Sequence, residues 1–236
     1  MTRLSEPEMT VVRNKAPVVP MDDERALAPA RIGIASGSRH HPSFIQLYYA
    51  IEARRSNSAP LVVQFLSPAT DTGTSTVACG YARVAADDCA QPVLYIDCNP
   101  YIPNRRDKKG DGPAIPTLFD TIRKGLPLRD AIVPARDGRN LLWARLASTD
   151  RPLLTVGGDR LQAILDQCRL HYPVVILDSP STEEAESAAS SRYCDGTVLV
   201  VAAGRTKQWE IESAKSLLER LGGQIVGLVL NRQSGR

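Results

Sequence analysis

One short segment constrains the fold of this chain more than any other feature. Residues 67–76 read Ser-Pro-Ala-Thr-Asp-Thr-Gly-Thr-Ser-Thr, between an apolar run, Leu61–Leu66, and a helix-like run, Ser75–Ala90. A strand, a glycine-containing turn and a helix form the layout of a phosphate-binding loop, because the backbone N–H groups at the start of a helix attract anions. The segment therefore predicts an α/β fold with an anion-binding turn at the edge of its sheet.

This segment, hereafter the phosphate loop, lacks the cation of a working nucleotide site. Thr74 stands where a lysine would reach the β- and γ-phosphates, and Asp71 adds a carboxylate where phosphate charge would collect. A like-charge contact at ~4 Å costs on the order of 1–4 kcal/mol, and the lost lysine removes a favourable contribution of similar size. We therefore expect Mg–ATP to bind weakly, and we expect no other cofactor. The candidate nucleotide-binding residues are Asp71, Thr72, Gly73, Thr74, Ser75, Thr76 and, at a later strand end, Asn231. The alternative is a plain strand-to-helix turn capped by Thr72 or Thr74.

Apolar strand-like runs alternate with helix-like runs through the rest of the chain. Continuously apolar strands between helices indicate a doubly wound, mostly parallel sheet that is covered on both faces. Strands are expected at Leu61–Leu66, Pro92–Asp97, Asn140–Leu146, Val174–Asp178, Thr197–Ala202 and Ile225–Leu230. Helices are expected at residues 44–51, Ser75–Ala90, Thr117–Lys124, Leu128–Val133, Leu161–Cys168 and Ala214–Leu221. Residues 1–42, which are rich in Pro and charged groups, are expected to form an extended or disordered arm before a domain over residues 43–236.

Two of the apolar strands end in an aspartate. Asp97 and Asp178 should meet at the carboxyl edge of the sheet, where open α/β sheets bind ligands. Together with the hydroxyl of Ser75 they could hold a hydrated Mg²⁺. The alternative is that each aspartate only caps the turn that follows it. Asn231 could likewise pair with an adenine edge or close a turn.

Composition excludes several classes of protein. The formal net charge of +3 is small for a nucleic-acid binder, so no nucleic-acid partner is expected. The five cysteines include no C-x-x-C pair, which argues against a zinc site or a disulfide framework and fits a reducing cytoplasm. No run approaches the ~20 apolar residues that span a bilayer. We expect a soluble protein that meets a membrane only through a partner.

The order of these motifs resembles the bacterial tyrosine kinases of capsule and exopolysaccharide assembly, the CpsD/CapB type, which are related to the MinD/ParA ATPases. The family's loop reads roughly S-P-x-P-G-E-G-K-S-T, and its later motifs are D-x-D, D-x-P, D-G-x-x-L-V-V and G-x-V-L-N. The matching segments here are residues 67–76, Asp97-Cys98-Asn99, Asp178-Ser179-Pro180, residues 195–201 and residues 227–231. The resemblance covers about residues 43–233. It implies a P-loop NTPase architecture in which Asp97 and Asp178 are the catalytic residues, and Ser75, Asp97 and Asp178 surround Mg²⁺.

The chain departs from this family where the chemistry is most demanding. The loop lysine is Thr74, the first loop glycine is Asp71, and the second acid of D-x-D is Asn99. The family's C-terminal tyrosine cluster has no counterpart, because no tyrosine follows Tyr193. The family's E-x-x-R-x-x-R oligomerisation motif is matched only by Glu52, Arg54 and Arg55 in a different spacing.

These departures predict an impaired or inactive kinase-like domain that acts in exopolysaccharide synthesis or export. The resemblance implies a cytoplasmic protein at the inner face of the inner membrane, bound there to a separate polysaccharide co-polymerase, and a homo-oligomer is compatible with it. Two alternatives stay open: a MinD/ParA-like ATPase switch, and a structural adaptor without ligand. Lys108 and Arg205 are candidates for a cation that folds into the site and replaces the lost lysine.

Overall fold

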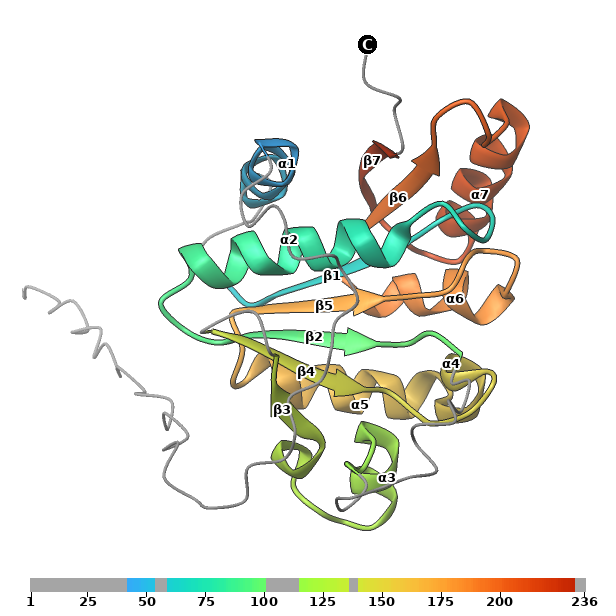
Figure 1. Cartoon of the computed structure of the whole chain (residues 1–236). Helices are drawn as coiled ribbons and strands as arrows, with labels where there is room; N and C mark the ends of the chain where they lie inside the picture. Colours follow the sequence, from blue (N-terminus) through green and yellow to red (C-terminus); the bar gives the residue numbers. More distant parts are fainter. Residues whose placement is uncertain (1–41, 54–58, 101–114, 136–139, 232–236) are drawn as a thin grey trace, which may run out of the picture.

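A mostly parallel sheet forms the centre of the molecule (Figure 1). The computed structural model describes residues 42–53, 59–100, 115–135 and 140–231. Within these ranges the strands lie in the order β3-β4-β2-β5-β1-β6-β7, and every neighbouring pair is parallel except β3 with β4. The strands are β1 Leu61–Leu66, β2 Val93–Asp97, β3 Ile132–Pro134, β4 Leu141–Arg145, β5 Val174–Asp178, β6 Gly196–Ala202 and β7 Ile225–Asn231. The predicted doubly wound α/β fold is confirmed.

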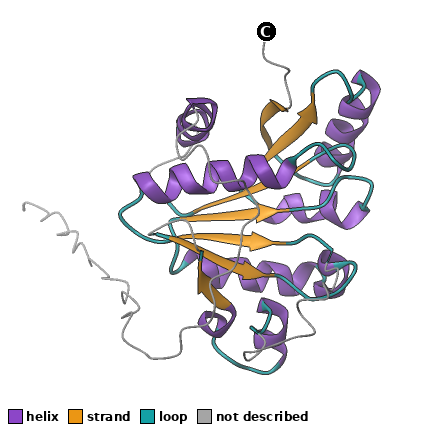
Figure 2. Ribbon diagram, viewed as in Figure 1, coloured by secondary structure: helices purple, strands orange, loops and turns teal. Residues whose placement is uncertain are grey.

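Helices cover both faces of this sheet (Figure 2). One face is covered by α1 and α2, and the other by α5, α6 and α7, while α3 and α4 lie beside α5. The helices are α1 Pro42–Glu52, α2 Thr74–Asp88, α3 Leu118–Arg123, α4 Pro152–Val156, α5 Gly158–Arg169, α6 Ala185–Ser190 and α7 Gln208–Arg220. Burial on both faces explains why the central strands are mostly apolar.

The α1–α2 layer shows how small and aromatic residues share the core. The ring of Tyr81 on α2 lies 5.3 Å from that of Phe65 on β1 and 5.9 Å from that of Tyr48 on α1. A Cβ added at Gly80 would stand only 2.5 Å from the Phe44 ring, so glycine is what lets α1 dock on α2. The amphipathic face predicted for residues 44–51 therefore packs inward as expected.

One predicted helix is partly wrong. Residues Leu128–Ala131 form a single 3₁₀ turn, and the next three residues form the edge strand β3. Val133 is buried opposite Trp143 in an antiparallel pair, so β4 imposes the extended conformation on this short β-branched segment. The short helices α4 and α6 were not predicted. Each is only five or six residues long, too short for a clear helical period.

Some predictions fall on residues that the structure does not describe. The predicted arm is among them, since residues 1–41 are not described, and so are Arg54, Arg55 and Lys108. None of the helices in the described ranges is long and apolar enough to cross a bilayer.

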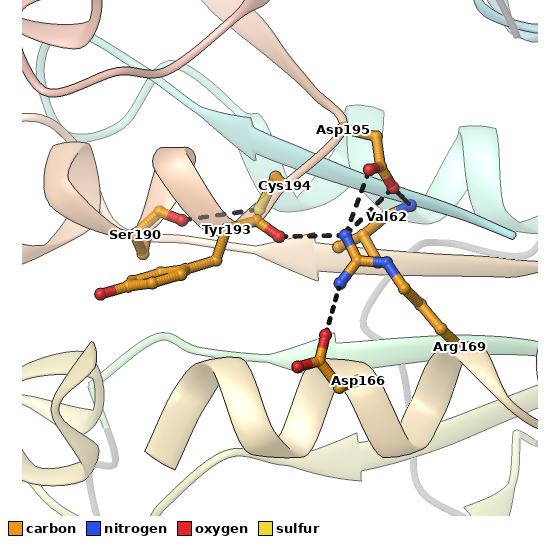
Figure 3. Close-up of polar contacts among 7 residues, drawn as sticks. All are labelled: Val62, Asp166, Arg169, Ser190, Tyr193, Cys194 and Asp195. Carbon is orange, nitrogen blue, oxygen red and sulfur yellow. Dashed lines mark hydrogen bonds and ion pairs between the residues drawn. The ribbon is translucent and has the colours of Figure 1, made fainter. Parts of the chain in front are cut away.

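The amino edge of the sheet is held by Asp195, just before β6 (Figure 3). Its Oδ2 accepts a 2.7 Å hydrogen bond from the Val62 N–H, and its own N–H donates to the Val62 carbonyl at 2.8 Å. Arg169 at the end of α5 lies 3.2 Å from both Asp195 oxygens and donates to the Tyr193 carbonyl at 3.1 Å. This cluster fixes β1 against β6 and α5, and β1 leads directly into the phosphate loop.

Candidate functional site

The phosphate loop keeps the backbone shape that a glycine-rich loop would have. Gly73, the residue before α2, has φ 84°, and Asp71 has φ 58°. Both values lie in the left-handed region that only glycine enters without strain. The turn thus has a left-handed backbone at two positions, and one of them, Asp71, carries an acidic side chain.

Neither threonine caps helix α2, so the capping expected in the alternative interpretation is wrong. The hydroxyl oxygens of Thr72 and Thr74 lie 2.9 Å from each other, and both side chains are nearly buried. The N-cap residue of the helix is Gly73, and no side-chain capping hydrogen bond is made at this position. Thr74 is therefore directed into the protein, and it supplies neither a charge nor a cap at the start of α2.

Contacts from two later segments hold the loop in place. The Asn231 amide at the end of β7 donates to the Thr72 carbonyl at 2.9 Å, so Asn231 closes the loop from one side. On the other side the Thr182 N–H donates to the Ser67 carbonyl at 2.8 Å. The Glu183 carboxylate accepts from the Thr70 N–H at 3.3 Å, which adds a second acid beside the loop. Sequence patterns gave no signal for Thr182 or Glu183, which follow β5 in an irregular segment.

The two predicted aspartates lie side by side at the carboxyl edge of the sheet. Asp97 on β2 is the register partner of Asp178 on β5, and on its other side it is the register partner of Arg145 on β4. We call these three residues the strand-end row. The predicted meeting of the two acids is thus confirmed by geometry, and the row ends in a cation that sequence reasoning missed.

Asp97 is fully engaged by its neighbours. Its Oδ2 lies 2.9 Å from Arg145 Nη2, and only about a fifth of either side chain is exposed, 17% for Asp97 and 22% for Arg145. Its Oδ1 accepts from the Asn99 N–H at 3.0 Å, so Asp97 caps the turn after its own strand, as the alternative interpretation had it. The Arg145 guanidinium also lies 5.5 Å from the centre of the Trp143 ring, which helps to hold it in place.

Asp178 is buried, with only 2% of its surface exposed. Its Oδ2 accepts 2.7 Å hydrogen bonds from the Tyr95 hydroxyl and the Asn99 amide. Burial raises the pKa of Asp178 to about 7, and the nearby charge of Asp97 adds to the rise, while the Ser75, Tyr95 and Asn99 groups oppose it. No described group makes a hydrogen bond of ordinary geometry to its other oxygen, Oδ1.

These observations test whether the site fits a divalent ion. Ser75 at the start of α2 and the unsatisfied Oδ1 of Asp178 are oxygen groups of the kind that Mg²⁺ binds, so these two residues fit. Asp97 is already engaged at both oxygens, by Arg145 and by Asn99, so a metal ion would compete with these groups for it. No cluster of three or more His, Cys, Asp or Glu side chains suited to a metal occurs in the described part of the chain. Arg205, one of the two cations considered as replacements for the loop lysine, lies on an exposed turn after β6.

Comparison of the sequence with those of known proteins finds similarity to bacterial tyrosine-protein kinases. No protein-family model matches it. It is 28% identical over 82 residues to CapB of Staphylococcus aureus, which is assigned as a tyrosine-protein kinase. The matched residues make up 34% of this chain and 36% of CapB. It is 34% identical over 64 residues to the tyrosine-protein kinase CpsD of Streptococcus agalactiae serotype Ia, covering 27% of this chain and 28% of CpsD. The chain is related to the CapB and CpsD tyrosine-protein kinases. The matched segments span about a third of the length of these relatives.

Solved structures show the same fold. The kinase domain of the Escherichia coli tyrosine kinase ETK superposes with a TM-score of 0.64 at 20% identity, over 81% of this chain and 75% of that one. The chimerical protein CapA2B2 gives 0.67 at 22% identity, over 81% and 84%. MinD from Pyrococcus horikoshii, solved with Mg-ADP, gives 0.58 at 20% identity, over 73% and 70%. The predicted P-loop NTPase architecture of the MinD/ParA kind is therefore confirmed.

Proposed function

We propose that this chain is a tyrosine-kinase-like domain of capsule or exopolysaccharide synthesis or export whose ATP chemistry is impaired. Its kinship to CapB and CpsD supports the setting. The observation that carries the impairment is the Arg145–Asp97 ion pair, because Asp97 is the residue that would act as base. A substrate hydroxyl would have to compete with Arg145 and with the Asn99 N–H for the two oxygens of this carboxylate.

The phosphate loop argues in the same direction. Phosphoryl transfer depends on positive charge around the transferred group, and the loop contributes Thr74 and Asp71 where a lysine and a glycine are expected. Ser75 and Asp178 would hold a divalent ion there, and such an ion would neutralise part of the phosphate charge when bound. Gly73 and the first N–H groups of α2 would bind a phosphate through the backbone alone. Weak binding of Mg–ATP, with little or no transfer, is the expected behaviour.

The remaining work of the domain is to bind a partner. We propose a separate inner-membrane polysaccharide co-polymerase, which would place the chain at the cytoplasmic face of that membrane. The likeness to CapA2B2, a chimerical protein, is compatible with a two-component arrangement. Trp209 on α7, 61% exposed beside a shallow depression of about 360 Å³, is a surface residue on which this contact can be tested.

Two assays test the proposal together. With γ-labelled ATP and Mg²⁺, the wild-type chain should transfer no more phosphate than its Asp97→Asn variant. In a strain that lacks the gene, the wild type and Asp97→Asn should restore polymer to the same extent, whereas Trp209→Ala should restore less. Phosphate transfer that disappears in Asp97→Asn, with loss of polymer in the same variant, would show an active kinase instead.

An ATPase switch is the second candidate, and the likeness to MinD solved with Mg-ADP is what favours it. Such a switch dimerises when it binds ATP. Light scattering with and without Mg–ATP therefore separates the two: a mass that doubles only with ATP supports the switch. A mass that ignores ATP supports the impaired kinase-like domain or a plain adaptor. Mg–ATP binding then distinguishes these two, because the impaired kinase-like domain should bind Mg–ATP weakly and a ligand-free adaptor should not bind it.

A further inference from the structure

We propose that Arg145 is a specificity-determining residue of this site, and that it keeps divalent metal ions away from Asp97. The inference deepens the proposed function, since it treats the strand-end row as the remnant of a Mg–nucleotide site. It concerns metal ions alone, without nucleotide, so its test can fail while the proposed function stands.

The strand-end row places Arg145 next to Asp97, the residue that a metal ion would approach. Arg145, Asp97 and Asp178 are register partners on three adjacent strands, and the carboxyl ends of such strands lie about 4.8 Å apart. A metal ion that reached Asp97 would therefore come close to the guanidinium. The Arg145–Asp97 pair is mostly shielded from water, so the repulsion between that guanidinium and a dication is only partly screened.

Both oxygens of Asp97, and one oxygen of Asp178, already have partners in the protein. Asp97 Oδ2 faces Arg145 at 2.9 Å, and Oδ1 accepts from the Asn99 N–H at 3.0 Å. The Asn99 amide donates to Asp178 Oδ2, which also accepts from Tyr95. Of these four carboxylate oxygens, Asp178 Oδ1 is the one that makes no hydrogen bond of ordinary geometry with a described residue, and the Ser75 hydroxyl is near this carboxylate. Arg145 and Asn99 thus satisfy Asp97 with protein groups, where a metal ion would otherwise be the natural partner of two adjacent carboxylates.

Arg145 is held in position by Trp143 and by Asp97. Its guanidinium lies 5.5 Å from the Trp143 ring centre, and Trp143 precedes it by two residues on the same face of β4. A cation anchored by a carboxylate on one side and an aromatic ring on the other is pre-organised. It therefore remains at Asp97 and does not swing into solvent when a metal ion approaches.

Mn²⁺ binding to the full chain, measured by electron paramagnetic resonance without nucleotide, tests this proposal. Arg145→Gln should bind Mn²⁺ more tightly than the wild type, on the order of tenfold or more, because a positive charge leaves the neighbourhood of two carboxylates. Mg²⁺ should raise the thermal midpoint of this variant more than that of the wild type. Arg145→Lys, which keeps the charge, should show neither effect.

Arg151→Gln is the matched control. It removes an arginine from the Arg151–Glu186 ion pair, which has two 2.7 Å contacts and does not involve Asp97. An equal gain of Mn²⁺ affinity in Arg151→Gln would overturn the proposal, because only net charge would then matter. Unchanged affinity in Arg145→Gln would also overturn it.

A second variant covers the case in which Arg145→Gln does not fold. Arg145→Met, which keeps an unbranched side chain beside Trp143 but removes the charge, should show the same gain of Mn²⁺ affinity. A folded Arg145→Met variant that binds Mn²⁺ no more tightly than the wild type would contradict the proposal.

Discussion

Arg145 Nη2 lies 2.9 Å from Asp97 Oδ2, across the carboxyl ends of two neighbouring parallel strands. The acid that would serve as base in a working kinase thus has a protein cation as its partner. The phosphate loop next to it contains no Lys or Arg, and its Thr74 is turned inward against Thr72. At the carboxyl edge of the sheet, the guanidinium of Arg145 therefore pairs with Asp97, while the phosphate loop has no positively charged side chain.

Restoring the loop should restore nucleotide binding. The double variant Asp71→Gly/Thr74→Lys removes an acid and adds the missing cation, and we expect Mg–ATP affinity to rise by roughly two decades or more. Titration calorimetry measures this change. Ser148→Lys/Asp150→Gly, at two exposed positions in the loop after β4, makes the same change of +2 in net charge elsewhere on this edge and should leave the affinity nearly unchanged. An equal gain in both variants would mean that bulk charge, and not loop chemistry, limits binding.

Asp178 should make stability depend on pH. Its pKa of about 7 in the folded state is above its ordinary value of 3.8, so between these values the folded chain binds more protons than the unfolded chain. Stability therefore falls as pH rises through this window, and the buried charge costs up to about 4 kcal/mol above pH 7. Asp178→Asn should remove this cost and be more stable than the wild type at pH 8, with the difference shrinking toward pH 4. Urea unfolding at several pH values measures it.

The contrary result for Asp178 is equally plain. If Asp178→Asn is less stable than the wild type at pH 8, the carboxylate is stabilised in its charged form and the proposed cost of burial is wrong. Asp159→Asn, an exposed acid on α5, is a suitable control because it changes the same charge without any burial.

Gln64 on β1 should be a strong determinant of stability. Its buried amide donates to Ser179 Oγ at 3.0 Å, Ser187 O at 2.9 Å and Ser190 Oγ at 2.8 Å, and so joins β1 to the segment after β5 and to α6. Gln64→Leu leaves these buried acceptors without their donor and should cost about 1–3 kcal/mol. Hydrogen exchange should also speed up in residues 179–184, which contact the phosphate loop. Gln162→Leu on the exposed face of α5 should change stability by no more than about 0.5 kcal/mol. Similar costs in both variants would contradict the role of the network.

Asp195 should control the start of β1. Asp195→Ala removes the acceptor of the Val62 N–H and a partner of Arg169, and should cost about 1–2 kcal/mol while the Val62 amide exchanges faster. Asp166→Ala removes the other ion pair of Arg169, at 3.3 Å, but no backbone hydrogen bond (Figure 3). It should therefore leave the Val62 amide protected. Faster exchange at Val62 in both variants would place the effect in Arg169 and not in the backbone contact.

Some features of the fold and site could be predicted because they follow from local pattern. Apolar strands that end in Asp97 and Asp178 meet at one edge, since parallel strands share their carboxyl ends. Asn231, at the end of the parallel strand β7, lies at the same edge and therefore contacts the phosphate loop. The left-handed backbone at Asp71 was not predicted, because aspartate gives no direct signal of positive φ. It becomes intelligible only beside the glycine of the related loops.

Arg145 could not be found from the sequence because its role depends on strand order. It ends a strand about fifty residues after Asp97, and only the placement of β4 beside β2 makes the two neighbours. Glu183 is a similar case, since an irregular segment folds it over the loop. The strand β3 was misread as helix because its extended shape comes from pairing with β4, which a local pattern does not contain.

We infer that this site binds Mg–ATP only weakly although the fold is that of a P-loop NTPase. Titration calorimetry of the wild-type chain with ATP and Mg²⁺ tests it most directly. We expect the wild-type chain to give no heat of binding at micromolar ATP. Its Kd for Mg–ATP should be no tighter than about 100 µM, two decades weaker than a micromolar site. Saturable one-to-one binding with a micromolar Kd would contradict the account.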